Sequence, residues 1–304
     1  MRRKSKGTIV IALGGNALVL KGQKGTAREQ ARNAAKTAGQ IAKIINAGYE
    51  VVLTHGNGPQ VGNLLIQQKA GEGEVPAQPM DVCGAMSQGQ IGYMLQQELG
   101  KRVKKPIVTV LTQVLVSKHE SAFKNPTKPV GPFYEKKKPK MVWDAGRGYR
   151  KVVPSPKPVE IVEKKALQDL VKSGVILIAC GGGGIPVVRK KGGLYGVEAV
   201  IDKDLAAEKL AEAVKADILL ILTAVPHISL CYGTKQETRI RKLNVPLAKK
   251  YLRNGQFPPG SMGPKVEAMI KFIEKGGKKA VVSSPESALS ALDGKAGTTM
   301  VKRG

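Results

Sequence analysis

The sequence predicts an α/β protein, a three-layer αβα sandwich built around a mainly parallel central sheet. Apolar segments rich in β-branched residues recur along the chain, and helical patterns separate most of them; the segments span residues 8–13, 51–54, 107–111, 175–179, 218–222 and 280–282. Strands that alternate with helices favour parallel pairing, with helices on both faces of the sheet. With 304 residues, 42% of them hydrophobic, the chain is long enough to bury a large core. We therefore expect a single domain over residues 1–304.

The first helix is the most clearly specified element. Thr26 and Glu29 have the spacing of a capping box, in which each side chain accepts a hydrogen bond from the other residue's backbone. Gly48 stands where a glycine commonly ends a helix. Between these signals, apolar residues recur with helical spacing, and we expect them to face the sheet; they are Ala31, Ala34, Ala38, Ile41, Ala42 and Ile45.

Residues 117–158 interrupt the alternation of strands and helices. They contain seven prolines and the run Lys136-Lys137-Lys138, and no regular hydrophobic period is sustained. A structureless loop of this length is unusual in a compact domain. We therefore expect a small protruding lid subdomain, inserted within the main domain. Further along, two short β-like segments within residues 186–201 flank Gly192-Gly193 and predict a hairpin.

Composition excludes several classes of protein. No apolar run approaches the about 20 residues that span a bilayer, and the basic start of the chain is neither a signal peptide nor an anchor, so we expect a cytoplasmic protein. Three widely spaced cysteines, Cys83, Cys180 and Cys231, suggest neither disulfides nor a zinc site. Cys180 follows an apolar run and is interpreted as a small buried hydrophobe.

The formal net charge of +27 indicates anionic partners. The basic residues are dispersed, however, and only 4% of residues are aromatic, so no stacking platform for single-stranded nucleic acid is evident. We expect no nucleic-acid or membrane partner. A basic nucleic-acid-binding protein is kept as an alternative of a different class, one that steep salt dependence of binding would support.

Glycine-rich loops follow three of the predicted strands. They are Gly14-Gly15-Asn16, Gly56-Asn57-Gly58 and Gly181–Gly184. Ligands of parallel sheets bind at the carboxyl ends of strands, and residues without Cβ let backbone N–H groups approach phosphate oxygens. Each loop alone is compatible with an ordinary turn, whereas three at one sheet edge indicate a phosphate site. None has the spacing of a Walker motif or of a dinucleotide fingerprint.

Two lysine-containing segments begin predicted helices, where the helix dipole already favours anions. One contains Lys203 and Asp204, and the other, residues 260–265, ends in Lys265. Asp204 alone is compatible with a helix cap, and Lys203 alone with a solvated charge. His55 is compatible with a general base or with a loop residue that bonds backbone. His119 and His227 lack metal-ligand spacing.

Together and in this order, these motifs resemble those of the carbamate kinases of the amino acid kinase family. The matching segments are residues 11–17 (IALGGNA), 54–62 (THGNGPQVG), 79–81 (PMD), 125–132 (NPTKPVGP), 181–184 (GGGG), 197–206 (VEAVIDKDLA) and 260–266 (GSMGPKV). They extend over nearly the whole chain. The resemblance implies the amino acid kinase fold, a homodimer, and reversible phosphoryl transfer between ATP and carbamate, used to make ATP from carbamoyl phosphate. Mg²⁺ is expected to arrive with ATP or ADP, with no protein metal ligands of its own.

The resemblance also implies residue roles. Gly14, Gly15, Asn16, Gly56, Asn57 and Gly58 are expected to surround carbamate and the transferred phosphoryl group. Lys128, Lys203, Asp204 and Lys265 are expected to be catalytic: Lys128 closes over the site from the lid, while Asp204 orients lysines that contact nucleotide phosphates. The expected nucleotide site further includes Gly182, Gly183, Thr223, Met262 and Gly263.

Related acetylglutamate and aspartate kinases usually carry a first-strand lysine where this sequence has Ala12, and Lys128 matches the residue that replaces it in carbamate kinases. Two alternatives remain open: the same chemistry run toward carbamoyl phosphate synthesis, and a kinase of another small carboxylate. The sequence departs from the family pattern at Pro226 and Cys231, in a segment that usually borders the nucleotide base.

Overall fold

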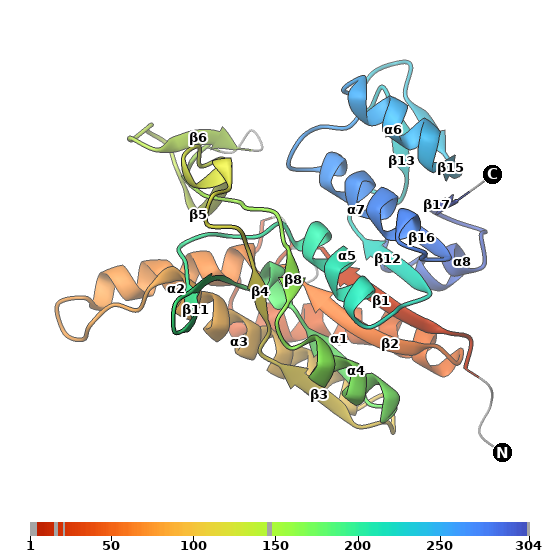
Figure 1. Ribbon diagram of the computed structural model, residues 1–304, viewed down its shortest axis with the longest axis horizontal. Coiled ribbons are helices and arrows are strands. Elements are labelled where there is room, and N and C mark those ends of the chain that lie inside the picture. Colours follow the sequence, from red (N-terminus) through yellow and green to blue (C-terminus); the bar gives the residue numbers. More distant parts are fainter. Residues whose placement is uncertain (1–4, 15–17, 21, 145–147, 303–304) are drawn as a thin grey trace.

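A mainly parallel sheet of eight strands forms the centre of the protein (Figure 1). The computed structural model describes residues 5–14, 18–20, 22–144 and 148–302. In order across the sheet, the strands are β15 (Lys242–Asn244), β17 (Thr298–Val301), β16 (Lys279–Ser283), β12 (Ile218–Leu222), β1 (Thr8–Leu13), β2 (Glu50–His55), β9 (Ile176–Ala179) and β3 (Ile107–Val110). All neighbours pair in parallel except β16 and β17. The predicted fold class is confirmed, and all six predicted strands lie in this sheet.

Helices cover both faces of the sheet, because each central strand is apolar on both sides. In β1, Ile9 and Ile11 pack with α1 (Ala27–Asn46), α3 (Met80–Gly100) and α8 (Ala288–Leu292). Val10 and Ala12 face the opposite layer, formed by α4 (Lys164–Lys172), α5 (Lys203–Ala213), α6 (Val245–Arg253) and α7 (Met262–Glu274). This alternation follows from the two-residue period of a strand.

Helix α1 begins and ends as predicted. Thr26 and Glu29 form the capping box, and the C-cap Ala47 precedes Gly48, whose φ is +100°. The buried face, however, includes Gln30, Asn33 and Thr37, and Ala31 is exposed. The expectation that Ala31 faces the sheet is therefore wrong. The helical period places Ala31 on the solvent-facing side of α1. The buried side includes polar residues that bond neighbouring loops, as Asn33 does with the Leu18 carbonyl.

The stretch 117–158 forms a small sheet of its own. After the short 3₁₀ helix η2 (Ser121–Phe123), strands β5 (Lys128–Tyr134), β7 (Gly148–Val153) and β6 (Met141–Asp144) pair in antiparallel order β5-β7-β6. This sheet, called the lid below, rises above α2 (Gly58–Gly71), and α6 and α7 lie across from it (Figure 1).

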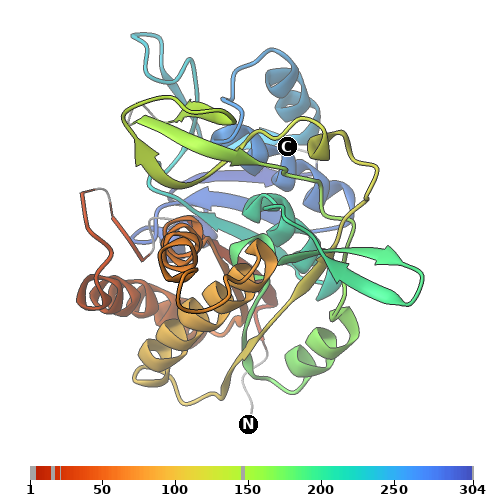
Figure 2. The ribbon, with the colours of Figure 1, turned by 90° about the vertical axis from the view of Figure 1, so that its left-hand side faces the viewer.

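A second small sheet, in the order β11-β10-β4-β8, lies where the chain leaves and re-enters the main body around the lid. It contains β4 (Gln113–Leu115), β8 (Glu160–Ile161), β10 (Ile185–Lys190) and β11 (Gly193–Gly196). The β10–β11 pair is the predicted hairpin, and it projects from one side of the molecule (Figure 2). Strands β13 (Ile228–Leu230) and β14 (Thr238–Ile240) form a separate antiparallel pair.

Within the described ranges, every helix is too short or too polar to cross a membrane. Cys83 and Cys180 are buried and Cys231 is exposed, all three with free thiols. Cys180 behaves as the predicted buried hydrophobe, since burial raises the pKa of its thiol to about 12.

Candidate active site

The candidate site lies at the edge of the sheet where β1, β2, β9 and β12 all end, because these parallel strands run in the same direction. The Gly14 N–H donates to the Leu222 carbonyl at 2.9 Å, and the Gly56 N–H donates to the Leu13 carbonyl at 3.0 Å. These two hydrogen bonds connect adjacent strands at the points where the loops begin. Of the first predicted loop only Gly14 is described, since Gly15 and Asn16 lie outside the described residues.

The four-glycine loop after β9 packs so closely against its surroundings that side chains would not fit. A Cβ at Gly181 would lie 2.3 Å from Nε2 of His55, and one at Gly182 would lie 2.2 Å from Nδ2 of Asn57. A Cβ at Gly183 would lie 2.3 Å from the Ile201 carbonyl oxygen. The loop therefore brings together the predicted acceptor loop at Gly56–Gly58 and the segment that leads into α5.

The second loop is held by polar side chains from the main body. Asn57 is buried and its side-chain Nδ2 donates to Oγ of Ser87 on α3 at 2.8 Å. The Thr54 hydroxyl donates to the Cys180 carbonyl at 2.8 Å. Sequence reasoning missed Ser87, because it lies within a helix rather than at a strand end and its contact with Asn57 spans 30 residues. Gly58 begins α2, with Pro59 next to it in the first turn.

His55 lies beneath this edge and is only 2% exposed. Burial lowers the pKa of His55 to about 4, while a contact of 3.1 Å between Nδ1 and the Gly56 carbonyl acts in the opposite direction. The imidazole is therefore neutral at physiological pH, with Nδ1–H donating to that carbonyl. Of the two interpretations offered by the sequence, this geometry agrees with the loop residue that bonds backbone.

A buried carboxylate joins two lysines at the starts of α5 and α7. Oδ1 of Asp204 lies 2.6 Å from Nζ of Lys203, and its Oδ2 lies 3.1 Å from Nζ of Lys265. The Asp204 side chain is 4% exposed. Burial acts to raise the pKa of Asp204, but the two ammonium groups outweigh it and lower the pKa to about 2. The carboxylate therefore stays ionised and fixes both cations at helix N-termini, where an anion is also favoured.

Lys265 makes a further hydrogen bond at the beginning of α7. Lys265 also donates to the Ser261 carbonyl at 3.1 Å. Met262 and Gly263, both predicted for the nucleotide side, form the first residues of α7, and the Gly263 N–H donates to the Pro258 carbonyl at 3.1 Å. Thr223 directly follows β12, and its N–H donates to the Ser283 carbonyl of the neighbouring strand at 2.9 Å. These residues border the same sheet edge from the α7 side.

Lys128, the first residue of β5, reaches from the lid to the start of α5. Its Nζ lies 2.7 Å from Oδ2 of Asp202. Asp202 is the N-cap of α5, and its Oδ1 accepts the Asp204 N–H at 2.9 Å. All four lysine and aspartate residues predicted to be catalytic thus lie around one helix N-terminus. Asp202 was not among the predicted site residues, although aspartate before an apolar helix is a common N-cap signal.

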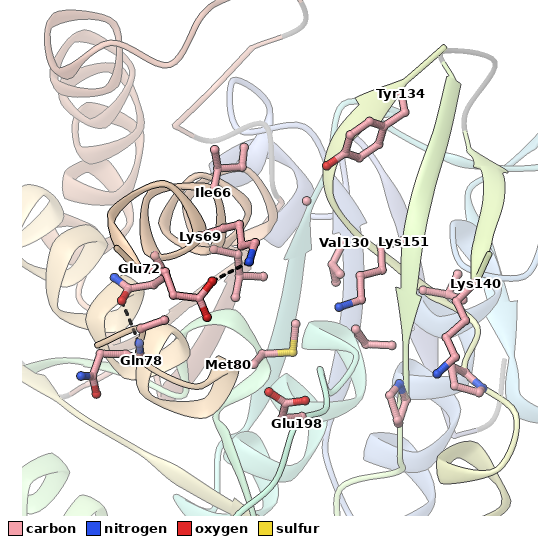
Figure 3. A pocket seen from close by; sticks show the side chains of 18 of the residues that line it. Ile66, Lys69, Glu72, Gln78, Met80, Val130, Tyr134, Lys140, Lys151 and Glu198 are labelled. Carbon is pink, nitrogen blue, oxygen red and sulfur yellow. Dashed lines mark hydrogen bonds and ion pairs between the residues drawn. The ribbon is translucent and has the colours of Figure 1, made fainter. Parts of the chain in front are cut away.

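A groove of about 940 Å³ separates the lid from α2 (Figure 3). Ile66 and Lys69 of α2 line one side, and Val130, Tyr134 and Lys151 of the lid line the other. None of the residues predicted for the site lines it. Five of its lining residues, Met80, Pro126, Val130, Gly131 and Glu198, lie in segments that match the family pattern, but the sequence assigned them no role, because the groove depends on how the lid folds back over α2.

No cluster of three or more His, Cys, Asp or Glu side chains within the described ranges has the arrangement of a metal site. The two carboxylates nearest the candidate site, Asp202 and Asp204, are each already paired with lysine. Such a donor set does not form a protein cage for a divalent cation. It fits Mg²⁺ that is held chiefly by phosphate oxygens.

Comparison with known proteins gives a consistent result. The model of the amino acid kinase family matches residues 7–284. The carbamate kinase of Pyrococcus horikoshii is 57% identical, with 95% of this chain and 98% of that protein covered. The carbamate kinase of Thermococcus kodakarensis is 55% identical, with 97% and 99% covered.

Solved structures agree with these relatives. A carbamate kinase from Giardia lamblia bound to AMP-PNP superposes with a TM-score of 0.91 at 43% identity, covering 97% of this chain and 98% of that one. An N-acetylglutamate synthase from Neisseria gonorrhoeae shares the fold alone, with a TM-score of 0.57 at 17% identity, covering 99% of this chain and 63% of that one.

Proposed function

Because the chain belongs to the amino acid kinase family, and within it to the carbamate kinases, we propose that it transfers a phosphoryl group reversibly between ATP and carbamate. The observation that carries this proposal is the convergence of Lys128, Lys203 and Lys265 on two aspartates at the start of α5. Three ammonium groups from three separate elements meet at the end of a parallel sheet, and such an arrangement suits a transferred phosphoryl group.

The chemistry requires positioning and neutralisation of charge more than proton transfer. The carbamate oxygen is already anionic, so no base has to remove a proton before it attacks the γ-phosphorus. The buried, neutral His55 is consistent with this, since it bonds a backbone carbonyl. The lysines then offset charge on the phosphoryl oxygens while the glycine loops allow close approach of backbone N–H groups.

We assign Lys203 and Lys265 to the nucleotide phosphates, with Met262, Gly263, Thr223, Gly182 and Gly183 nearby. Support comes from the position of both lysines at helix N-termini and from the Giardia carbamate kinase, which was solved bound to AMP-PNP. Gly14, Gly56, Asn57 and Gly58, together with Gly15 and Asn16, are assigned to carbamate and the phosphoryl group. Mg²⁺ enters with the nucleotide and shields the charge of its phosphates.

Lys128 and Ala12 favour carbamate over the larger carboxylates of related kinases. Ala12 is fully buried in β1, between β2 and β12, and faces the α5 layer. This strand position therefore supplies no positive charge, and Lys128 of the lid supplies it instead. A kinase of another small carboxylate remains the second candidate.

We propose that the physiological direction is ATP formation from carbamoyl phosphate, because this phosphate is an activated acyl phosphate. The reverse direction uses the same site. Free thiols at all three cysteines and nucleotide substrates are consistent with a cytoplasmic location.

A homodimer is the oligomeric state that we propose. Strand β3 is an edge of the eight-stranded sheet, and α3 packs beside it. Tyr93 on α3 is 65% exposed, and Leu111 just after β3 is 53% exposed. An open sheet edge next to exposed apolar side chains suits pairing with a second copy. Light scattering of the wild type and of Tyr93→Glu tests this, since the variant is expected to shift toward the monomer mass.

The function itself is tested by ATP formation from carbamoyl phosphate and MgADP. Acetyl phosphate and N-acetylglutamyl phosphate serve as alternative donors. Of the three donors, we expect only carbamoyl phosphate to give rapid ATP formation. Activity with another acyl phosphate at equal or higher kcat/KM would overturn carbamate as the acceptor, and no activity with any donor would overturn the kinase assignment.

A further inference from the structure

One aspartate, Asp202, bonds both the lid and the nucleotide side of the candidate site. Its Oδ2 lies 2.7 Å from Nζ of Lys128, and its Oδ1 accepts the backbone N–H of Asp204 at 2.9 Å. The same carboxylate therefore contacts the lid lysine and fixes the residue that holds Lys203 and Lys265. No other described residue bonds both Lys128 and the backbone of α5.

The lid also contacts the body through apolar and backbone interactions, but these do not involve the Lys128 side chain. Val130 and Val153 of the lid form a small apolar cluster with Met80 of α3. The backbones of Gly131 and Gly62 approach closely, since a Cβ at Gly62 would lie 3.0 Å from the Gly131 Cα. The groove between α2 and the lid leaves the remaining lid surface there apart from the body (Figure 3). Without a specific partner, the long Lys128 side chain would sample many rotamers.

The burial of the pair makes its charge interaction effective. The side chain of Lys128 is 28% exposed and that of Asp202 is 14% exposed. A pair screened from water on most sides is coupled more strongly than an exposed surface pair. The ammonium group is held beside the first turn of α5, within reach of an anion bound at that helix N-terminus.

We propose that Asp202 is a positioning residue for the phosphoryl transfer: its carboxylate holds Lys128 over the start of α5, so that lid and nucleotide machinery form one preorganised site. This inference rests on the proposed function, because Lys128 must contact the transferred group for its position to affect turnover. When the phosphoryl group binds, Lys128 gains a second anionic partner beside the one that oriented it. The entropy of ordering this side chain is then already spent before the substrate arrives.

The competing explanation is that Asp202 serves only as the N-cap of α5. The two roles use different oxygens, so they separate by substitution. Asp202→Asn keeps a carbonyl oxygen that accepts the Asp204 N–H, but it removes the charge and turns an amide nitrogen toward Lys128. If Asp202 serves only as a cap, Asp202→Asn should change kcat/KM for carbamoyl phosphate little. If Asp202 positions Lys128, the same substitution should clearly lower kcat/KM.

A double-mutant cycle with Lys128→Ala is the decisive experiment. We expect Asp202→Asn to lower kcat/KM for carbamoyl phosphate ~10-fold in the wild-type background and less than ~2-fold when Lys128 is already alanine, because a residue acting through another has no effect once that partner is gone. KM for MgADP should stay within ~2-fold throughout. Asp169→Asn, which breaks an exposed ion pair with Lys165 on α4, is the matched control and should leave both constants unchanged.

Equal losses from Asp202→Asn in both backgrounds would overturn the proposal, and so would unchanged kinetics in the wild-type background. A readout that needs no catalysis keeps the test independent of the proposed function. Lysine acetylation rates, measured by mass spectrometry with acetic anhydride, should rise at Lys128 in folded Asp202→Asn but not at Lys203 or Lys265. If the wild type forms no ATP, the proposed function fails, whereas an unchanged acetylation rate at Lys128 shows that Asp202 does not hold it.

Discussion

Lys265 and Lys128 are both expected to meet phosphate oxygens, but the parts of the molecule that hold them differ greatly. Lys265 lies in the first turn of α7, a helix whose apolar face lies in the main core, and its Nζ bonds the buried Asp204. Lys128 begins a strand of the lid, whose apolar cluster with the body contains only three buried residues. The nucleotide side is therefore a frame built into the main core, whereas Lys128 comes from a separate small sheet and reaches the site through its ion pair with Asp202.

The difference indicates how the two functions are divided. A fixed pair of lysines preorganises charge at no cost when the nucleotide binds. A lysine on a loosely attached lid allows a small substrate to enter and then be covered. Substitutions in the frame should therefore affect folding and activity together, and substitutions at the lid contact should affect activity alone.

The largest effect is expected at Asp204. Asp204→Asn leaves two ammonium groups close together at buried helix ends, so kcat should fall ~10³-fold and the free energy of unfolding should fall by about 3 kcal/mol. Enzyme assays and urea unfolding measure the two quantities. Asp169→Asn on α4 is the exposed control. Near-normal kcat in folded Asp204→Asn would contradict the view that this carboxylate organises the frame.

A pH effect is expected from His55 in the same frame. Its pKa is lowered to about 4 from the usual value of 6.5 by burial. The unfolded state therefore binds the proton first as pH falls, so stability is full above pH 6.5 and is lost toward pH 4, by on the order of 3 kcal/mol. Urea unfolding of the wild type across this range should show this slope, a free energy of unfolding that decreases as the pH falls.

His55→Gln should reduce that slope, and the exposed His119→Gln should keep it. A proton titration of the His55 ring by NMR gives the same information without a substitution. A midpoint near 6.5 would contradict the buried, neutral imidazole.

A smaller effect is expected at Gly182 in the four-glycine loop. Its φ is +69°, and an added Cβ would meet the Asn57 side chain at 2.2 Å. Gly182→Ala should therefore lower the free energy of unfolding by about 2 kcal/mol. The exposed helical Gly89 has open space around its Cβ position, so Gly89→Ala should be neutral or stabilising. Equal effects of the two substitutions would contradict the close packing of this loop against Asn57.

The frame was largely predictable from the sequence, and the lid contact was not. Strand ends, the helix N-termini at Lys203 and Lys265, and the capping box of α1 all follow from local patterns. The pairing of Lys128 with Asp202 joins residues 74 positions apart and depends on how the lid folds back. The Asn57–Ser87 bond likewise connects two elements that no local pattern relates.

Ala31 shows a second kind of failure. Counting apolar residues assigned it to the buried face of α1, whereas Gln30, Asn33 and Thr37 occupy that face. Polar residues are buried there because neighbouring loops and helices offer partners: Nε2 of Gln60 on α2 donates to Oε1 of Gln30 at 2.9 Å. Hydrophobic periodicity cannot anticipate such partners.

The most direct test of the two-part site is a comparison of Michaelis constants in Lys128→Ala and Lys265→Ala, both checked for folding by circular dichroism. We expect Lys128→Ala to raise KM for carbamoyl phosphate and lower kcat while KM for MgADP stays within ~2-fold, and Lys265→Ala to raise KM for MgADP more than KM for carbamoyl phosphate. Identical changes in both constants for both variants, or wild-type kinetics in either folded variant, would contradict a fixed nucleotide side opposed by a lysine on the lid.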